Sequence, residues 1–206
     1  MFIHIFIIPY FSPICNRFVR CCLKKISKFK RVMYAVAVIS MVLMFAAFGI
    51  YRLNGVRFYV TVGITAMTVC YHFTIRLFIG NIVDAIMRNE ADWRKPWFRQ
   101  RKFEEKLYKK LKVKRWKNHL PTIDENAFAL GKQPIERIIG ATCQSEIVHE
   151  LDVLASLAAI LFAIPFGDLW VFLITSILGA AFDMMFVIMQ RYNRPRLLNV
   201  LKRRNR

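Results

Sequence analysis

Four long apolar runs, separated by charged segments, set the pattern of this sequence. They cover residues 32–51, 58–83, 147–164 and 169–189. A helix rises about 1.5 Å per residue, so about 20 apolar residues cross a hydrocarbon core of about 30 Å. The third run has the shortest apolar part, because Glu150 and Asp152 interrupt it. The pattern predicts an all-α integral membrane protein with about four transmembrane helices.

The third and fourth runs are joined only by residues 165–168, which predicts an antiparallel helical hairpin. Counting outward from its tip, Asp183 falls opposite Leu151, about one turn from His149. A carboxylate this deep in an apolar helix is costly without a partner, and ionisable groups inside a membrane usually mark a functional site. We therefore expect Asp183 to pair with His149, or with Arg76 of the second run.

Basic residues flank the apolar runs. The chain has 32 Lys and Arg against 13 Asp and Glu, a formal net charge of +19. Such a charge is typical of nucleic-acid binders, but here the cations gather beside the predicted membrane helices, so no nucleic-acid partner is expected. The loop at 52–57 carries only two Arg, and the loop at 165–168 carries no Lys or Arg. The positive-inside rule predicts a multi-pass protein of the cell membrane, with both termini and the long middle segment in the cytoplasm.

These features divide the chain into five parts. They are a basic N-terminal segment at 1–31, transmembrane helices one and two at 32–86, a basic middle segment at 87–134, the hairpin of helices three and four at 135–190, and a basic tail at 191–206. In the middle segment Phe103, Leu107 and Leu111 recur every four residues, which predicts a basic amphipathic helix in the headgroup layer on the cytoplasmic side. The alternative is a functional role, in which the lysines of this helix form one side of a binding site for an anionic substrate.

The cysteines indicate neither a disulfide framework nor a metal site. Their number is odd, four of the five are predicted on the reducing side of the membrane, and no Cys-x-x-Cys pair occurs. No Gly-rich phosphate loop and no His-Glu-x-x-His motif is present. We therefore expect no metal and no bound cofactor. The five residues are Cys15, Cys21, Cys22, Cys70 and Cys143.

Two clusters carry the candidate chemistry. Glu146 and His149 are three residues apart on one helix face, where a carboxylate can hold the tautomer of an imidazole and raise its basicity, as in a general base. The alternative is a polar pair that marks where the helix leaves the lipid. The second cluster follows the fourth run, where Pro195 is expected to end the helix. Its guanidinium and amide groups suit phosphate or a polar headgroup; they belong to Gln190, Arg191, Asn193, Arg194 and Arg196.

Three blocks of the sequence resemble the bacterial glycosyl-diaponeurosporenoate acyltransferases, which place a fatty acyl group on a sugar hydroxyl in staphyloxanthin-type carotenoid synthesis. The blocks are residues 113–121, which include Trp116 and Lys117, residues 135–149, and the run QRYNRPRL at 190–197. This chain has Ala141 and Gln144 where the family pattern has Glu and Arg, and Asp183 where it often has Asn. The resemblance implies a membrane acyltransferase of glycolipid and carotenoid biosynthesis.

The leading hypothesis is an acyltransferase that works at the cytoplasmic membrane face. Its donor would be an acyl thioester, either acyl-CoA or acyl carrier protein, and its acceptor a lipid-linked sugar such as a glycosyl carotenoid. His149 would act as the base toward the acceptor hydroxyl, with Glu146 or Asp183 orienting the ring. Substrate binding is expected from Trp116, Lys117, Gln190, Arg191, Asn193, Arg194 and Arg196.

Two other functions fit the same sequence. A non-catalytic basic scaffold would bind anionic membrane lipid or a protein partner through its Lys and Arg. A small transporter or channel subunit would use His72, Arg76 and Asp183 as a polar path across the membrane.

Overall fold

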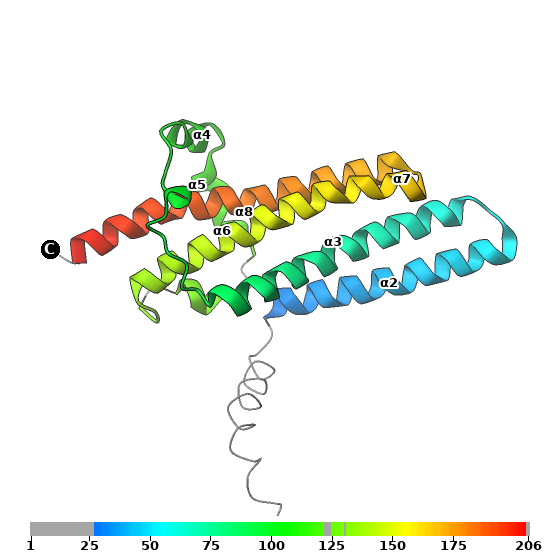
Figure 1. Cartoon of the computed structure of the whole chain (residues 1–206), viewed down its shortest axis with the longest axis horizontal. Helices are drawn as coiled ribbons and strands as arrows, with labels where there is room; N and C mark the ends of the chain where they lie inside the picture. The colour runs from blue at the N-terminus through cyan, green and yellow to red at the C-terminus, as the bar shows by residue number, and fades with distance from the viewer. Residues whose placement is uncertain (1–26, 122–124, 130, 205–206) are drawn as a thin grey trace, which may run out of the picture.

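The computed structural model describes residues 27–121, 125–129 and 131–204 (Figure 1). The basic N-terminal segment before residue 27, with Cys15, Cys21 and Cys22, lies outside the described residues. Helices dominate the described chain, and no strand occurs within it. Four helical stretches are long and apolar enough to cross a membrane, which confirms the predicted all-α protein with four candidate spans.

These four stretches form two antiparallel hairpins (Figure 1). The first pairs α2 (Lys28–Asn54) with α3 (Phe58–Met87). The second pairs α6 (Ile135–Ala158) with α8 (Leu169–Arg204). Between them, η4 (Ala159–Phe162) and α7 (Ala163–Phe166) continue the path of α6 to the turn. The short connection at 165–168 thus makes the predicted hairpin, and α3 packs against it.

Local signals fix the ends of the first hairpin. The side-chain oxygen of Ser27 accepts a hydrogen bond from the Lys30 amide at 3.2 Å, which caps the first turn of α2. Gly55 adopts a left-handed conformation with φ of 69°, and its amide donates to the carbonyl of Tyr51 at 2.8 Å. Near the turn, the hydroxyl of Thr61 donates to Asp168 at 3.1 Å, so the turns of the two hairpins lie at the same level.

The outer faces of the long helices are apolar, and polar side chains lie between the helices. Phe45, Leu154 and Trp170 are exposed, whereas His72 and Asp183 are buried. A water-soluble protein places most large apolar residues inside and most charged residues outside. The reversed distribution fits helices whose outer faces contact lipid.

The opposite end of the bundle carries most of the charge. We call it the basic end; there α2 begins at Lys28, α3 ends at Met87, α6 begins at Ile135 and α8 ends at Arg204 (Figure 1). The middle segment lies beside this end. Its short helices are η1 (Pro96–Phe98), α4 (Glu104–Lys110), α5 (Val113–Trp116), η2 (Lys117–His119) and η3 (Glu125–Phe128).

The amphipathic stripe predicted for the middle segment is present on a shorter helix than expected. The apolar positions from Phe103 to Leu111 are exposed, while Glu104 and Tyr108 on the other side of α4 are buried. The helix ends because Lys112 takes a left-handed conformation with φ of 50°. The exposed stripe fits contact with lipid, and its place in the headgroup layer stays a prediction.

Pro195 does not end the fourth span, so that sequence-based prediction is wrong. α8 continues through Pro195 to Arg204. A proline removes one backbone hydrogen bond from a helix because it lacks an amide hydrogen. Packing offsets this loss, since Leu201 beyond the proline lies in a buried cluster with Ile135 and Ile139 of α6.

Candidate active site

Asp183 lies at the centre of a polar cluster between three of the long helices. Its Oδ1 atom is 3.2 Å from Nδ1 of His149 on α6. Its Oδ2 atom accepts a hydrogen bond from Nη2 of Arg76 on α3 at 2.5 Å, and the carboxylate is 1% exposed. Both partners that the sequence offered as alternatives therefore contact Asp183, and the predicted contact with His149 is confirmed.

The His149 ring is held on one face and at one nitrogen. It stacks on Phe186, with ring centroids 4.4 Å apart and planes 12° from parallel. A proton on Nδ1 can be donated to Asp183, which leaves the lone pair of Nε2 available. No residue in the described part of the chain hydrogen-bonds Nε2, and the side chain is 16% exposed. This is the arrangement of an Asp–His pair whose outer nitrogen can take a proton from a substrate.

Small and polar residues position the guanidinium of Arg76. Its Nη1 donates to the carbonyl of His72 at 2.7 Å, and its Nη2 donates to Oγ of Ser156 at 3.0 Å. Gly179 makes room for it, because a Cβ atom there would lie 3.0 Å from Nη2 of Arg76. The positive charge of Arg76 thereby compensates the buried negative charge of Asp183.

A second carboxylate, Asp152, approaches the same imidazole. Its Oδ2 atom lies 3.9 Å from Nδ1 of His149, while its Oδ1 atom has no hydrogen-bond partner in the described structure. His149, Asp152 and Asp183 offer ligand atoms that lie within 4.8 Å of one another, so these three residues could hold a metal ion. Arg76 already supplies a positive charge to Asp183. The sequence-based expectation of no metal stays a prediction.

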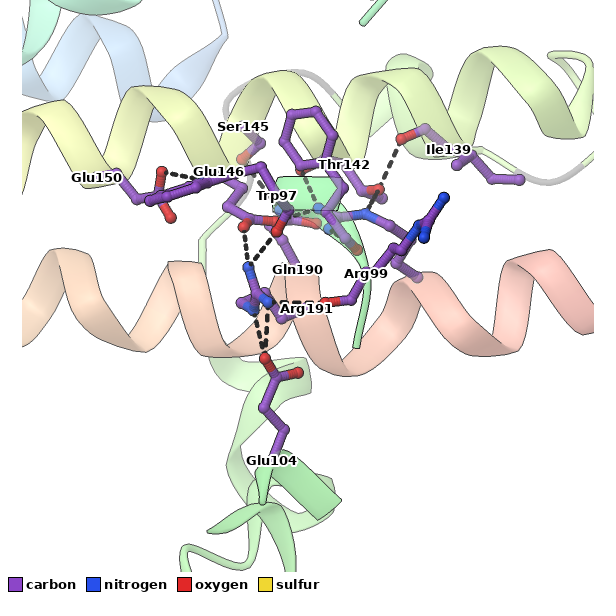
Figure 2. A network of polar contacts seen from close by, with 12 residues as sticks. Trp97, Arg99, Glu104, Ile139, Thr142, Ser145, Glu146, Glu150, Gln190 and Arg191 are labelled. Carbon is purple, nitrogen blue, oxygen red and sulfur yellow. Dashed lines mark hydrogen bonds and ion pairs between the residues drawn. The ribbon is translucent and has the colours of Figure 1, made fainter. Parts of the chain in front are cut away.

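Glu146 belongs to a different cluster (Figure 2). On α6 it precedes His149 by three residues and so lies nearer the basic end, where this helix begins. The residue is 0% exposed. Its Oε1 atom accepts a hydrogen bond from Nη1 of Arg191 at 2.5 Å, and its Oε2 atom accepts one from Nη2 of Arg194. Neither carboxylate oxygen pairs with His149 in the described structure. Of the two residues expected to orient the imidazole, it is Asp183 that contacts it.

Glu104, which sequence analysis does not single out, extends this cluster from the middle segment. Figure 2 shows Arg191 between Glu104 and Glu146. Glu104 accepts hydrogen bonds from Arg191 Nε at 3.0 Å and Nη2 at 2.7 Å, and from the hydroxyl of Tyr108 at 2.7 Å. Burial and this last bond raise the pKa of Tyr108 well above its usual range, so the hydroxyl keeps its proton. Two arginines thus face two carboxylates, and the cluster is balanced in charge.

The two arginines also tie the middle segment to α8. Arg191 donates to the carbonyls of Trp97 at 3.2 Å and Arg99 at 3.1 Å. Arg194, which is 2% exposed, donates to the carbonyl of Phe98 at 3.1 Å. The guanidinium N–H groups of both arginines thus form hydrogen bonds within the protein. The phosphate contacts expected from the sequence would need N–H groups without such partners. That expected role stays a prediction.

The other residues expected to bind substrate also have partners within the chain. Lys117 donates to Oδ1 of Asn193 at 2.8 Å, and burial, with Arg196 nearby, lowers its pKa. The remaining pairs are Arg196 with Tyr192, Gln190 with Ser145, and Trp116 with Leu111. Two of the three sequence blocks on which the family resemblance rests, 113–121 and 190–197, are therefore in contact through Lys117 and Asn193. Substrate binding by these residues stays a prediction.

A polar junction between α3 and α6 holds the two hairpins together near the basic end. Gln144 donates to Oδ1 of Asp84 at 3.2 Å and accepts a hydrogen bond from the Asn89 amide at 2.6 Å. Gly140 permits this approach, because a Cβ atom there would lie 2.5 Å from the Asn89 carbonyl oxygen. Gln144 stands where the resemblance described above leads one to expect Arg, and here its amide has both donor and acceptor partners.

Comparison with known protein families identifies a match over the C-terminal half of the chain. Residues 94–203 match the family model of glycosyl-4,4'-diaponeurosporenoate acyltransferases. The matched region includes His149, Asp183 and the Glu146 cluster, whereas Arg76 precedes it. No curated protein and no solved structure matches the chain. Because the family model covers just over half of the 206 residues, the chain belongs to the glycosyl-4,4'-diaponeurosporenoate acyltransferase family.

Proposed function

We propose that the protein is an integral membrane acyltransferase that moves a fatty acyl group from a thioester donor to a hydroxyl of a lipid-linked sugar. The observation that carries the proposal is the contact between Asp183 and Nδ1 of His149, in a chain of an acyltransferase family. The contact leaves Nε2 available to a substrate. The four apolar helices that carry or adjoin the pair support a site close to lipid, where an acyl chain and a lipid-linked acceptor both dissolve.

The proposed reaction assigns a step to each member of this pair. Nε2 of His149 accepts the proton of the acceptor hydroxyl while its oxygen attacks the thioester carbonyl carbon. The carbon–sulfur bond then breaks, and the imidazolium returns the proton to the leaving thiolate. Asp183 holds the ring through Nδ1 and stabilises its transient positive charge. General-base catalysis of this kind contributes about 10²–10⁴-fold to the rate.

The arginines of the C-terminal block divide into two roles in this proposal. Arg191 and Arg194 hold Glu146 and the backbone of 97–99, and so fix the middle segment on α8. Arg196 is exposed, with its guanidinium 3.9 Å from the centre of the Tyr192 ring. It is the arginine of this block best placed to meet an anionic headgroup or donor phosphate.

The orientation is part of the proposal. The basic end faces the cytoplasm, in agreement with the positive-inside rule. Acyl-CoA and acyl carrier protein are both cytoplasmic, so either donor can approach the middle segment from that side. The acceptor enters from the lipid, with its sugar at the membrane surface.

The experiment uses the full chain in lipid nanodiscs, supplied with acyl-CoA or acyl carrier protein and with a panel of glycolipid acceptors, including a glycosyl carotenoid. Acylated product is scored by mass spectrometry. The variant His149→Ala should lose product formation and keep its membrane insertion and thermal stability. The matched control is His119→Ala, which removes an exposed histidine of the middle segment and should keep full activity.

Other outcomes favour other functions. Wild-type protein that gives no product with any donor and acceptor would favour the basic scaffold. Full activity of His149→Ala would keep the enzyme and discard this base. A transporter predicts that thiol reagents reach cysteines placed near Asp183 from both sides of the membrane, whereas the enzyme predicts access from the basic end alone.

A further inference from the structure

A hollow at the basic end lies beside the Glu146 cluster. It has a volume of about 440 Å³, and pockets that hold small ligands have volumes of roughly 300–1,000 Å³. Its walls come from two segments that are distant in sequence, one within residues 93–104 and the other within the last turns of α8. The residues that line it include Trp93, Arg94, Arg99, Leu198 and Lys202.

Three cations of this hollow have no acidic partner among the described residues. Arg94, Arg99 and Lys202 are exposed, and no carboxylate in the described part of the chain forms an ion pair with them. Glu104 also lines the hollow, but Arg191 neutralises it at 2.7 Å. The hollow therefore has a net positive charge, and guanidinium forks are well suited to phosphate oxygens.

An apolar wall accompanies these cations. Trp93, Pro195 and Leu198 line the same hollow. The Arg94 guanidinium lies 5.3 Å from the centre of the Trp93 ring, which helps to hold this arginine over the hollow. Phosphates beside a flat apolar ring, as in an adenine nucleotide, match this combination. A carrier protein presents a broad acidic surface and would not need an aromatic ring beside the cations.

The distance from the hollow to His149 is comparable to the length of the pantetheine arm of CoA. Arg194 lines the hollow and follows Asp183 by eleven residues on α8. At about 1.5 Å per residue, the hollow lies about 16 Å along the helix from the carboxylate that contacts His149. In a CoA thioester the pantetheine arm separates the reactive sulfur from the phosphates by a length of this order.

We propose that this hollow binds the phosphorylated nucleotide end of a CoA thioester, with Arg94, Arg99 and Lys202 holding its phosphates. The identification of this ligand as the acyl donor rests on the proposed function. The site itself can be tested by binding alone. CoA is the probe, and pantetheine, which lacks the phosphates, is the comparison ligand.

The test compares two triple variants of the full chain in nanodiscs. Arg94→Gln, Arg99→Gln and Lys202→Gln together remove the unpaired cations. Lost charge-assisted hydrogen bonds should weaken CoA binding by roughly 100-fold and raise the KM for acyl-CoA similarly. The kcat should change little, because these contacts exist in both ground and transition states. The control triple removes the same charge from exposed residues outside the hollow, Lys106, Lys110 and Lys114.

The control triple should bind CoA within about twofold of wild type, and pantetheine should not compete with CoA, as expected for a phosphate site. Equal CoA binding by wild type and the first triple would overturn the proposal, as would an equal loss in the control triple. Acyl transfer from acyl carrier protein without any CoA binding would also overturn it and identify the carrier protein as donor. CoA binding that depends on the three cations, in a protein without acyl transfer, would support the site and reject only the proposed function.

Discussion

Oδ1 of Asp183 lies 3.2 Å from Nδ1 of His149, although the two residues are 34 positions apart in the chain. The short turn between α6 and α8 brings them to the same depth. The other oxygen of Asp183 meets Arg76 of α3, so one carboxylate joins three helices. The stability of the site and its proposed chemistry therefore depend on the same charges.

The balance of charge around Asp183 predicts how Arg76→Gln behaves. Without Arg76, Asp152 and Asp183 lie near one imidazole with no fixed positive charge, and breaking a buried ion pair costs about 3–5 kcal/mol. Adding Asp183→Asn removes the carboxylate that Arg76 compensates, so the double variant should be more stable than Arg76→Gln alone. Thermal unfolding in detergent measures this, with Arg52→Gln at the exposed end of α2 as the control. A double variant that is less stable than Arg76→Gln would contradict the charge-balance account.

The Glu146 cluster is expected to stabilise the fold. Glu146→Gln removes the carboxylate that pairs with Arg194 and one of the two that pair with Arg191. Arg194 is too deeply buried for water to replace the lost carboxylate. The free energy of unfolding should fall by about 3–5 kcal/mol. Glu150→Gln, one turn later on α6, is the control, because Glu150 accepts one hydrogen bond from Trp97 at 3.0 Å; it should cost about 1 kcal/mol. Equal stability of the two variants would show that the cluster is not a structural clamp.

The close approach of α6 to the end of α3 gives a third prediction. Gly140→Ala places a methyl group 2.5 Å from the backbone oxygen of Asn89, and a backbone atom cannot turn aside as a side chain does. Overpacking should lower the free energy of unfolding by about 1–3 kcal/mol. Gly80→Ala on α3 is the matched control, since a Cβ atom there meets nothing within 4 Å. A neutral Gly140→Ala would mean that the two hairpins separate easily at this point.

The membrane orientation can be tested separately. Reporter fusions at Asn54 and Gly167 should read as external, and fusions at Gly131 and Asn205 as cytoplasmic, because Lys and Arg gather on the side of the last two. An external reading at Gly131 would move the basic end and the hollow away from the cytoplasmic donors.

The sequence predicts the parts of this structure that depend on local pattern. Apolar runs of sufficient length predict the four spans, and the short turn at 165–168 fixes the register that joins Asp183 to His149. The error at Pro195 arises because packing of Leu201 on Ile135 and Ile139 overrides a local helix-breaking signal.

The parts that the sequence does not predict depend on contacts between distant segments. Glu146 lies three residues before His149, a spacing that favours their pairing, yet Arg191 and Arg194 occupy its carboxylate. The arginine block looks free for phosphate because Glu104, which neutralises Arg191, is 87 positions away in the chain. Arg94, Arg99 and Lys202 become recognisable as a group only when the middle segment folds onto α8.

The pairing of His149 with Asp183 can be tested by the kinetics of the two single variants and the double variant. His149→Ala should lower kcat by about 10²–10⁴-fold. Asp183→Asn should lower it less, because the imidazole remains and loses only its orienting carboxylate. Residues that act as a unit have non-additive effects. Each variant is compared with wild type at a temperature at which all of them are folded.

The most direct measurement is therefore the kcat for acyl transfer of the double variant, His149→Ala with Asp183→Asn, in nanodiscs at saturating donor and acceptor. If Asp183 acts through His149, the double variant should be no slower than His149→Ala alone. A double variant slower by the product of the two single effects would show that the two residues act independently, which would contradict the proposed pair.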